Sequence, residues 1–128
     1  MNITKELILS KLEEKESKLK PLHEKLSLPI ITRIFKKMQH GLKFMSIHVS
    51  SDELIIDGHH RYIASLLADY SIEVVSDYPK PTKVNEIDWK TVDFVDDDWD
   101  AESKIKMLNE QDARYNGMKI EEIEGILD

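Results

Sequence analysis

Apolar positions in the N-terminal third of the chain recur at the spacing of two amphipathic helices. The first helix is predicted over residues 2–20, with apolar side chains on one side and lysine and glutamate on the other. Residues 22–28 are interpreted as a connector or a short turn of helix. The second helix is predicted to start at Ser27 and Pro29, because serine caps helix N-termini and proline suits a first turn. Gly41 fits the position just beyond its end.

Past the second helix the pattern changes to the alternation of β-strands. Residues 45–49 alternate apolar and polar side chains, residues 51–52 suit a turn, and residues 54–56 supply a second strand. A helix is predicted over about residues 60–69, and apolar residues between 72 and 75 predict a third strand. Strand, turn, helix and strand in this order form a compact βαβ-like unit.

The C-terminal third combines one more strand with two helices. A proline-containing loop is predicted over residues 78–81, a strand over 91–95, a helix over 100–115 and a short helix over 120–127. The sequence contains no internal repeat. We therefore expect this part to pack on the same core as the preceding elements.

Length and element order predict a single α/β domain with a small mixed sheet and flanking helices. The chain has 128 residues, which suits one domain with a core of its own. The central part of the fold is placed at about residues 22–78. A helical N-terminal extension over residues 1–21 and a C-terminal extension over residues 82–128 complete the predicted domain.

Composition and charge narrow the classes of partner. The formal net charge is −7 and the sequence pI is about 5.2, which disfavours nucleic acid because phosphate backbones are bound by clustered lysine and arginine. The chain has no cysteine, which excludes disulfides and thiolate chemistry. No apolar stretch is long enough to cross a membrane, and the charged N-terminus is unlike a signal peptide. A cytoplasmic protein is therefore expected, and an effector exported without a classical signal would share these features.

The most informative segment lies where the predicted second strand meets the following helix. Residues 57–62 read Asp-Gly-His-His-Arg-Tyr. Glycine lets the backbone approach a ligand closely, and the start of a helix offers unpaired N–H groups and a partial positive charge. Two imidazoles and a guanidinium at that end favour a phosphate or another anion. The competing interpretation is a structural turn with solvent-exposed histidines.

This turn, together with the order of elements over about residues 22–78, resembles the ParB/sulfiredoxin superfamily. The similarity is carried mainly by residues 55–64, Ile-Ile-Asp-Gly-His-His-Arg-Tyr-Ile-Ala, and is short but rather specific. The turn is also similar to the motif of the DGQHR proteins of DNA phosphorothioation systems, from which it differs at one position. In the superfamily this turn holds nucleotide phosphates: ParB binds and hydrolyses CTP, sulfiredoxin uses ATP, and another member is a free-serine kinase.

The resemblance implies a role for each residue of the turn. Gly58 and the amides of His59, His60 and Arg61 would cradle phosphate, and Arg61 would neutralise its charge. His60 matches the histidine of the sulfiredoxin and DGQHR motifs, and in a catalytic site His59 or His60 would transfer protons, because imidazole titrates near neutral pH. Asp57 would hold Mg²⁺ through oxygen, with capping of the helix as the alternative. The implied ligand is a nucleotide such as ATP, ADP or CTP.

Two departures from the superfamily limit the implied activity. His59 stands where sulfiredoxin has its catalytic cysteine, and His60 replaces one of the two arginines that end the ParB motif. Neither sulfiredoxin chemistry nor a partition role is therefore expected, and the acidic C-terminal segment does not resemble a DNA-reading region. The leading function is nucleotide or phosphate binding, with Mg²⁺-dependent phosphotransfer or nucleotide hydrolysis as the chemistry of a catalytic site.

Two other classes of function stay open as alternatives. One is a small ParB-like nuclease of the toxin type, with His60 as base and Arg61 stabilising the charged transition state. The other is a non-catalytic adaptor that binds a protein partner through its acidic C-terminal helices.

Several residues outside the turn are candidates for further contacts. His48 is predicted as an exposed strand histidine, with a place near the turn as the alternative. The cationic residues of the second helix form either a solvated face or a second anion contact: Arg33, Lys36, Lys37 and His40. A second polar cluster is predicted near the end of the long helix: Gln111, Asp112 and Arg114.

Aromatic and acidic residues of the C-terminal segment have mainly structural interpretations. Trp89 and Trp99 are predicted as packing anchors, with stacking on a nucleotide base as the alternative. The acidic run 96–98 is interpreted as loop and helix N-terminal charge, since it lacks the spacing of a calcium loop. A zinc site is disfavoured because the adjacent His59 and His60 lack the spacing of zinc ligands.

Overall fold

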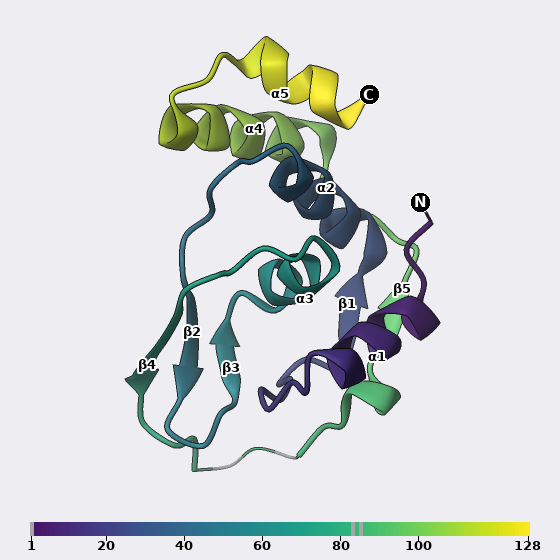
Figure 1. Cartoon of the computed structure of the whole chain (residues 1–128), viewed down its shortest axis with the longest axis vertical. Coiled ribbons are helices and arrows are strands. Elements are labelled where there is room, and N and C mark those ends of the chain that lie inside the picture. The colour runs from purple at the N-terminus through teal and green to yellow at the C-terminus, as the bar shows by residue number, and fades with distance from the viewer. Residues whose placement is uncertain (1, 83, 85) are drawn as a thin grey trace.

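A three-stranded mixed sheet lies at the centre of the sequence. In the computed structural model, which describes residues 2–82, 84 and 86–128, strands β2 (Ile47–Ser50), β3 (Ile55–Asp57) and β4 (Val74–Tyr78) lie in the order β3-β2-β4 (Figure 1). Strand β2 pairs antiparallel with β3 and parallel with β4. The predicted hairpin and third strand are therefore confirmed, and β4 extends into the segment predicted as a loop.

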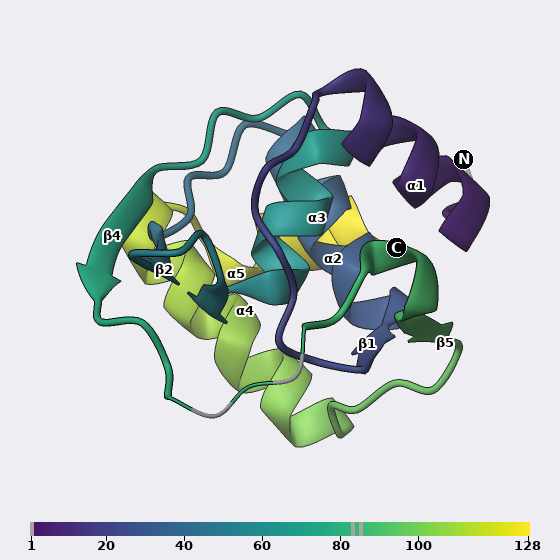
Figure 2. The same cartoon turned by 90° about the horizontal axis from the view of Figure 1, so that it is seen from below.

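Helix α3 (His59–Leu67) connects β3 to β4, and α2 (Leu28–Gln39) packs beside it (Figures 1 and 2). The two helices contribute fully or nearly fully buried side chains to one core, among them Ile31, Phe35 and Ile63. Helix α2 begins as predicted, because the Ser27 hydroxyl accepts a hydrogen bond from the N–H of its first turn. The sequence-predicted helices therefore flank the turn on which the candidate site depends.

A second sheet joins segments from distant parts of the chain. Strand β1 (Lys25–Ser27) pairs parallel with β5 (Asp93–Val95), which follows a 3₁₀ helix, η1 (Trp89–Thr91). The prediction that residues 22–28 form a connector or a short turn of helix is therefore wrong for Lys25–Ser27. A strand of three residues has no readable alternation, and its partner lies near the other end of the sequence, so periodicity does not reveal it.

The first helix is shorter than its apolar pattern predicts. Helix α1 covers Lys5–Glu14, not residues 2–20. Glu16 has a φ of +51°, which ends helical geometry, and Lys20 forms a parallel bridge with Leu54 at the edge of β3. Tertiary pairing at Lys20 overrides the local helical pattern.

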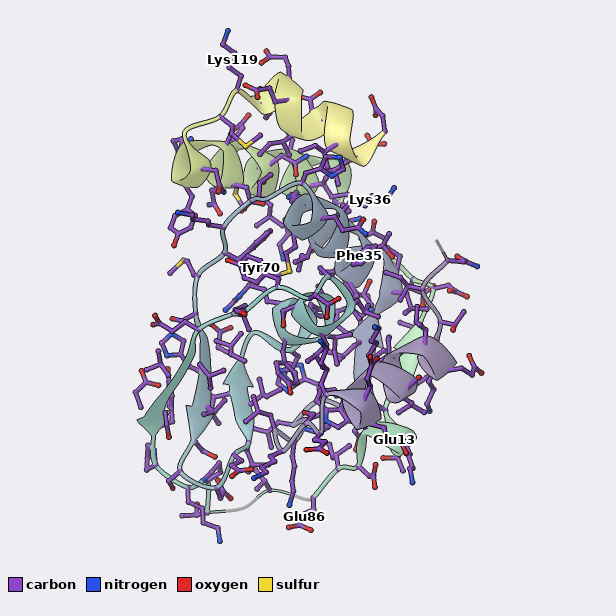
Figure 3. The ribbon with its side chains drawn as sticks, in the orientation of Figure 1. Glu13, Phe35, Lys36, Tyr70, Glu86 and Lys119 are labelled. Atoms are coloured by element: carbon purple, nitrogen blue, oxygen red, sulfur yellow. The ribbon has the colours of Figure 1, made fainter. Side chains whose placement is uncertain are left out.

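Helices α4 (Glu102–Asn116) and α5 (Ile120–Leu127) form a pair at one end of the molecule, drawn in green and yellow in Figure 1. They are joined at Gly117, whose φ is +63°, and they pack on a small separate core of Leu42, Ala113 and Ile123. Figure 3 shows Lys119 at this end and Glu86 at the opposite end. Helix α5 contacts both α4 and α2, which holds the pair against α2.

The main core draws on both predicted extensions. Ile8 and Leu12 of α1 are buried in it, as are Trp89, Val92 and Phe94 of the C-terminal segment. Helices and small sheets together confirm the α/β class. Within the residues that the structure describes, no helix is long and apolar enough to cross a membrane.

Candidate functional site

Gly58 is the N-cap of α3 and adopts a backbone conformation that favours glycine. Its φ is +103°. A Cβ atom at this position would lie 2.5 Å from Ile47 Cγ2 and 2.9 Å from Arg61 Nη2. No side chain within the described part of the chain caps this end of α3. The N–H groups of its first turn and its partial positive charge are therefore available to a ligand.

A cavity of about 930 Å³ opens beside this turn. Its walls come from α2, from the start of α3, from the connector between α2 and β2, and from α4. The volume lies in the range of small-molecule sites. Among the described residues, six lysine and arginine side chains and three aspartates line it, although the whole chain has a net charge of −7. The cavity is therefore a locally cationic site in an acidic protein.

Arg61 lies between the turn and the connector wall. Its Nη2 donates a hydrogen bond to the Ser46 carbonyl at 3.1 Å and lies 3.4 Å from Asp57 Oδ2. Its Nε is buried and has no hydrogen-bond partner among the described residues. A buried donor without a partner costs about 1–3 kcal/mol, and native structures contain few of them. Arg61 is thus held at the cavity with a donor still unused.

His59 and His60 both accept hydrogen bonds from the backbone of the segment before α2. The Leu22 N–H donates to His59 Nε2 at 2.9 Å, and the Ser27 N–H donates to His60 Nε2 at 3.0 Å. His59 is only 3% exposed and stacks on His23, with ring centroids 4.0 Å apart. The interpretation of the two histidines as solvent-exposed is therefore wrong for His59.

Burial fixes the charge of both imidazoles. It lowers the pKa of His59 to about 3, with smaller contributions from His23 and His60. Burial and then His23 lower the pKa of His60 to about 4, against the attraction of Asp100. Both rings are therefore neutral at pH 7, and because Nε2 is an acceptor, each carries its proton on Nδ1. Each ring is thus a hydrogen-bond donor, and it gains a proton at Nε2 only after losing its backbone partner. This arrangement suits binding better than general-base catalysis.

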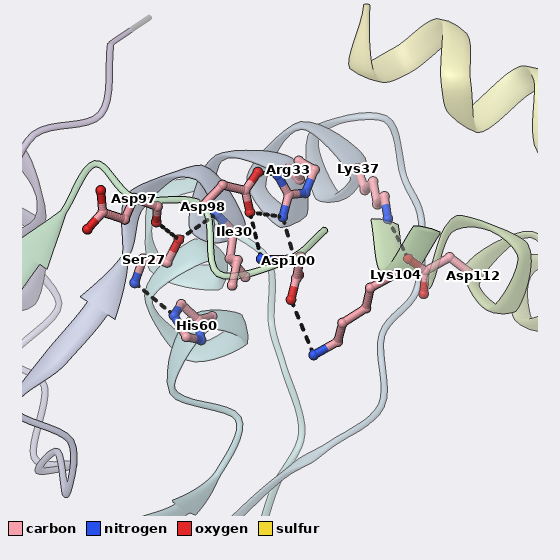
Figure 4. A network of polar contacts seen from close by, with 10 residues as sticks. All are labelled: Ser27, Ile30, Arg33, Lys37, His60, Asp97, Asp98, Asp100, Lys104 and Asp112. Carbon is pink, nitrogen blue, oxygen red and sulfur yellow. Dashed lines mark hydrogen bonds and ion pairs between the residues drawn. The ribbon is translucent and has the colours of Figure 1, made fainter. Parts of the chain in front are cut away.

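A chain of ion pairs ties α2 to the segment before α4 (Figure 4). Arg33 forms a bidentate pair with Asp98, with N–O distances of 2.5 and 2.9 Å, and its Nη2 lies 3.3 Å from Asp100 Oδ2. Asp100 lies 3.2 Å from Lys104 Nζ. The hydrogen bond from Arg33 lowers the pKa of Asp98. The acidic run that the sequence places in a loop therefore anchors that loop to α2.

Lys37 and Asp112 form a second link between α2 and α4. Lys37 is 4% exposed, and its Nζ lies 2.6 Å from Asp112 Oδ2. Gln111 and Arg114 line the same cavity as this pair. The second polar cluster predicted near the end of the long helix and the Gly58 turn therefore share one cavity.

Three of the other candidates lie away from the cavity. His48 is the cross-strand partner of Asp57, but its Nδ1 lies 2.9 Å from Asp77 Oδ2 and it does not line the cavity. Lys36 and His40 of α2 do not line it either, and the His40 ring contacts the Lys36 carbonyl at 2.9 Å. Of the cationic residues predicted on the second helix, Arg33 and Lys37 alone line the described cavity.

The donor set at the turn gives a metal only one largely exposed carboxylate. Among the described residues, no group of three or more His, Cys, Asp or Glu side chains is placed to hold a metal ion. Asp57 has a side chain that is 65% exposed and a single 3.4 Å contact with Arg61, whereas the cation-paired Asp100 is buried and Asp112 is partly buried. These residues fit Mg²⁺ only where ligand phosphates and water supply most of its coordination.

The sequence pattern does not place the two tryptophans or the inner face of α4. Trp89 is buried and donates from Nε1 to the Leu19 carbonyl at 2.8 Å, as expected of a packing anchor. Trp99 is 46% exposed, lines the cavity and meets His60 edge to face at 5.3 Å. Lys104 and Asn109 also line the cavity without any sequence signal beyond helical spacing.

The cavity is assembled from distant parts of the sequence. Its connector wall and its α4 wall come from segments that lie far apart in the sequence, so no short motif describes the whole cavity. No protein-family model matches this chain, and no curated protein or solved structure matches it significantly.

Proposed function

We propose that the cavity beside the Gly58 turn binds a phosphorylated small molecule, most readily a nucleotide. The observation that carries this proposal is the gathering of an uncapped helix N-terminus and an excess of cationic side chains in one cavity of an acidic protein. Helix N-termini favour phosphate because N–H groups and the helix dipole act together. The guanidinium of Arg61, whose side chain is 24% exposed, adds charge-assisted donors at the same place.

In the proposed complex, one phosphate occupies the first turn of α3. The amides of residues 59–61 and the guanidinium of Arg61 hold it, and Gly58 keeps the approach open. Lys43 and Arg114, which are exposed on the cavity wall, are placed to contact further phosphates. Asp57 contributes one oxygen to a Mg²⁺ ion that arrives with the phosphates.

The resemblance of residues 55–64 to the ParB/sulfiredoxin superfamily supports the same proposal. It assigns phosphate binding to this turn and nucleotides to the superfamily, and a ParB-like fold is part of the proposal. Binding is preferred to phosphotransfer or hydrolysis because the imidazoles of His59 and His60 are neutral and bound to backbone amides at Nε2. Proton transfer through either ring is not needed for binding.

Replacing Arg61 with alanine is expected to weaken nucleotide binding by about 10- to 100-fold, because a hydrogen bond to a charged group contributes about 1.5–3 kcal/mol. Isothermal titration calorimetry with ATP, ADP, CTP, GTP and tripolyphosphate measures this. Lys119→Ala removes an exposed cation immediately before α5 (Figure 3) and is the matched control. The proposal fails if the wild-type protein binds none of these compounds, or if both variants lose affinity equally.

Asp57→Asn is expected to abolish the part of nucleotide affinity that depends on Mg²⁺. The change keeps the size of the side chain and removes the charged oxygen ligand that Mg²⁺ prefers. Titrations with and without Mg²⁺ give the ratio of the two dissociation constants, which should approach one in the variant. An unchanged ratio would show that Asp57 is not a ligand.

A further inference from the structure

We infer that Asn109 reads the nucleobase of the bound nucleotide, an inference that rests on the proposed function. Asn109 lies on α4, is 5% exposed and lines the cavity. Its Oδ1 is buried without a hydrogen-bond partner among the described residues. Asparagine is seldom buried unless it is bonded, so this amide is the least explained polar group on the α4 wall.

The surroundings of Asn109 differ from those of the proposed phosphate position. Ile105 lies one helical turn before Asn109, and Leu108 lies one residue before it. Both line the cavity on the same face of α4. Ile30 and Ile34 of α2 line the cavity as well. The cationic residues proposed for phosphate contact lie instead on α3 and on the connector, with Arg114 at the end of α4. Between α2 and α4, these four apolar side chains and the Asn109 amide lie among cations that are already paired with aspartates: Arg33, Lys37 and Lys104. Gln111 supplies a second amide on α4.

A ligand that matches both the phosphate position and the surroundings of Asn109 has several negative charges at one end and a flat apolar body with a polar edge at the other. A nucleotide has this form. The edge of a nucleobase presents a donor and an acceptor side by side, and an asparagine amide presents the complementary pair, as in its contacts with adenine. The O and N atoms of the amide exchange places when it turns over, so Asn109 is able to match bases with either order of groups.

An amide with only a structural role would behave differently. Asn116, on the same helix, accepts a hydrogen bond from the Lys43 N–H at 2.6 Å and donates to the Lys43 and Asp112 carbonyls at 3.1 and 3.0 Å. It is fully engaged within the fold. Asn109 forms no such bonds among the described residues, so replacing it removes an unpaired polar group and not a structural contact.

The test compares Asn109→Leu and Asn109→Asp with the wild type by calorimetry, using ATP, CTP, GTP, UTP and tripolyphosphate. Asn109→Leu is expected to weaken the best nucleotide about tenfold and to leave tripolyphosphate affinity within about twofold. Asn109→Asp accepts hydrogen bonds only, so it is expected to shift preference toward ATP, CTP and GTP, whose bases carry an amino group, relative to UTP. If Asn109 contacts ribose instead, the affinities for all four nucleotides would change by the same factor, and this result would overturn the inference.

Thermal unfolding without ligand supplies the second measurement. Asn109→Leu is expected to raise the Tm by about 4 °C, because it removes a buried polar group without a partner. Asn116→Leu is expected to lower it. The inference would be overturned if Asn109→Leu lowers the Tm and weakens the affinities for nucleotides and for tripolyphosphate equally. The proposed phosphate binding would not be affected by that result. Absence of binding by the wild type would overturn the proposed function, and the inference with it.

Discussion

Replacing Gly58 with alanine is expected to lower the free energy of unfolding by about 3–5 kcal/mol, the sum of two costs. The first is backbone strain, since φ is +103° and side chains rarely adopt that conformation. The second is steric. The added Cβ would lie 2.5 Å from Ile47 Cγ2, and Ile47 is fully buried in β2, so relief requires movement of the core. Chemical denaturation gives the difference directly.

Alanine substitutions at two other glycines allow the strain and steric costs to be measured separately. Gly117 also has a positive φ, but an added Cβ would meet no atom within 4 Å, so Gly117→Ala should show the strain alone, about 1–2 kcal/mol. Gly125 lies within α5 with open space around it, so Gly125→Ala should stabilise by about 0.5–1 kcal/mol. A loss at Gly58 no larger than that at Gly117 would show that β2 and α3 are not closely packed at this turn.

The turn could be predicted from sequence because every signal that defines it is local. Gly58 follows an apolar strand and precedes an apolar helix within a few residues. Ser27 likewise marks the start of α2 through its local capping preference. Elements that lack such a local signal and depend on a distant partner could not be predicted. Strand β1 depends on β5, and the end of α1 depends on the pairing of Lys20 with Leu54.

The walls of the cavity differ in the same way: one could be predicted from local sequence and the other could not. Residues 57–61 are contiguous and share one motif, whereas the facing wall comes from α4 and is brought there by ion pairs such as Lys37–Asp112. Helical spacing shows that Asn109 is on the same side of α4 as Ile105, but not what that side faces. The polar cluster at Gln111, Asp112 and Arg114 could be named from sequence, while its place in the same cavity depends on the fold.

The two histidines have a role that the motif does not reveal. Their Nε2 atoms bind backbone N–H groups of residues 22 and 27, so they hold the segment around β1 against the start of α3. A proton on either Nε2 would convert an acceptor into a donor that faces another donor. The same imidazoles therefore position the phosphate-binding turn and make the fold sensitive to acid.

Lowering the pH from 7 to 4 is expected to reduce the free energy of unfolding by about 6 kcal/mol through His59 and His60. Their folded-state pKa values, about 3 and about 4, lie below the ordinary value of 6.5. As the pH falls below 6.5, the two imidazoles therefore bind protons in the unfolded chain but not in the folded chain. The stability is fully present above pH 6.5 and is lost as pH falls from 6.5 toward the folded-state values. Urea denaturation at a series of pH values measures it.

His59→Gln is the variant that isolates this effect, because a glutamine oxygen is able to accept the Leu22 N–H and does not titrate. Its stability is expected to be lower than wild type at pH 7 and to fall by about 3 kcal/mol less between pH 7 and pH 4. His40→Gln, which changes an exposed imidazole at the end of α2, is the matched control. Carboxylates such as Asp98 add their own loss at lower pH in all three proteins. The difference between the stability–pH curves of His59→Gln and His40→Gln therefore reports the titration of the buried His59 ring. Parallel curves from pH 7 to pH 4 would show that His59 is not held neutral by the fold.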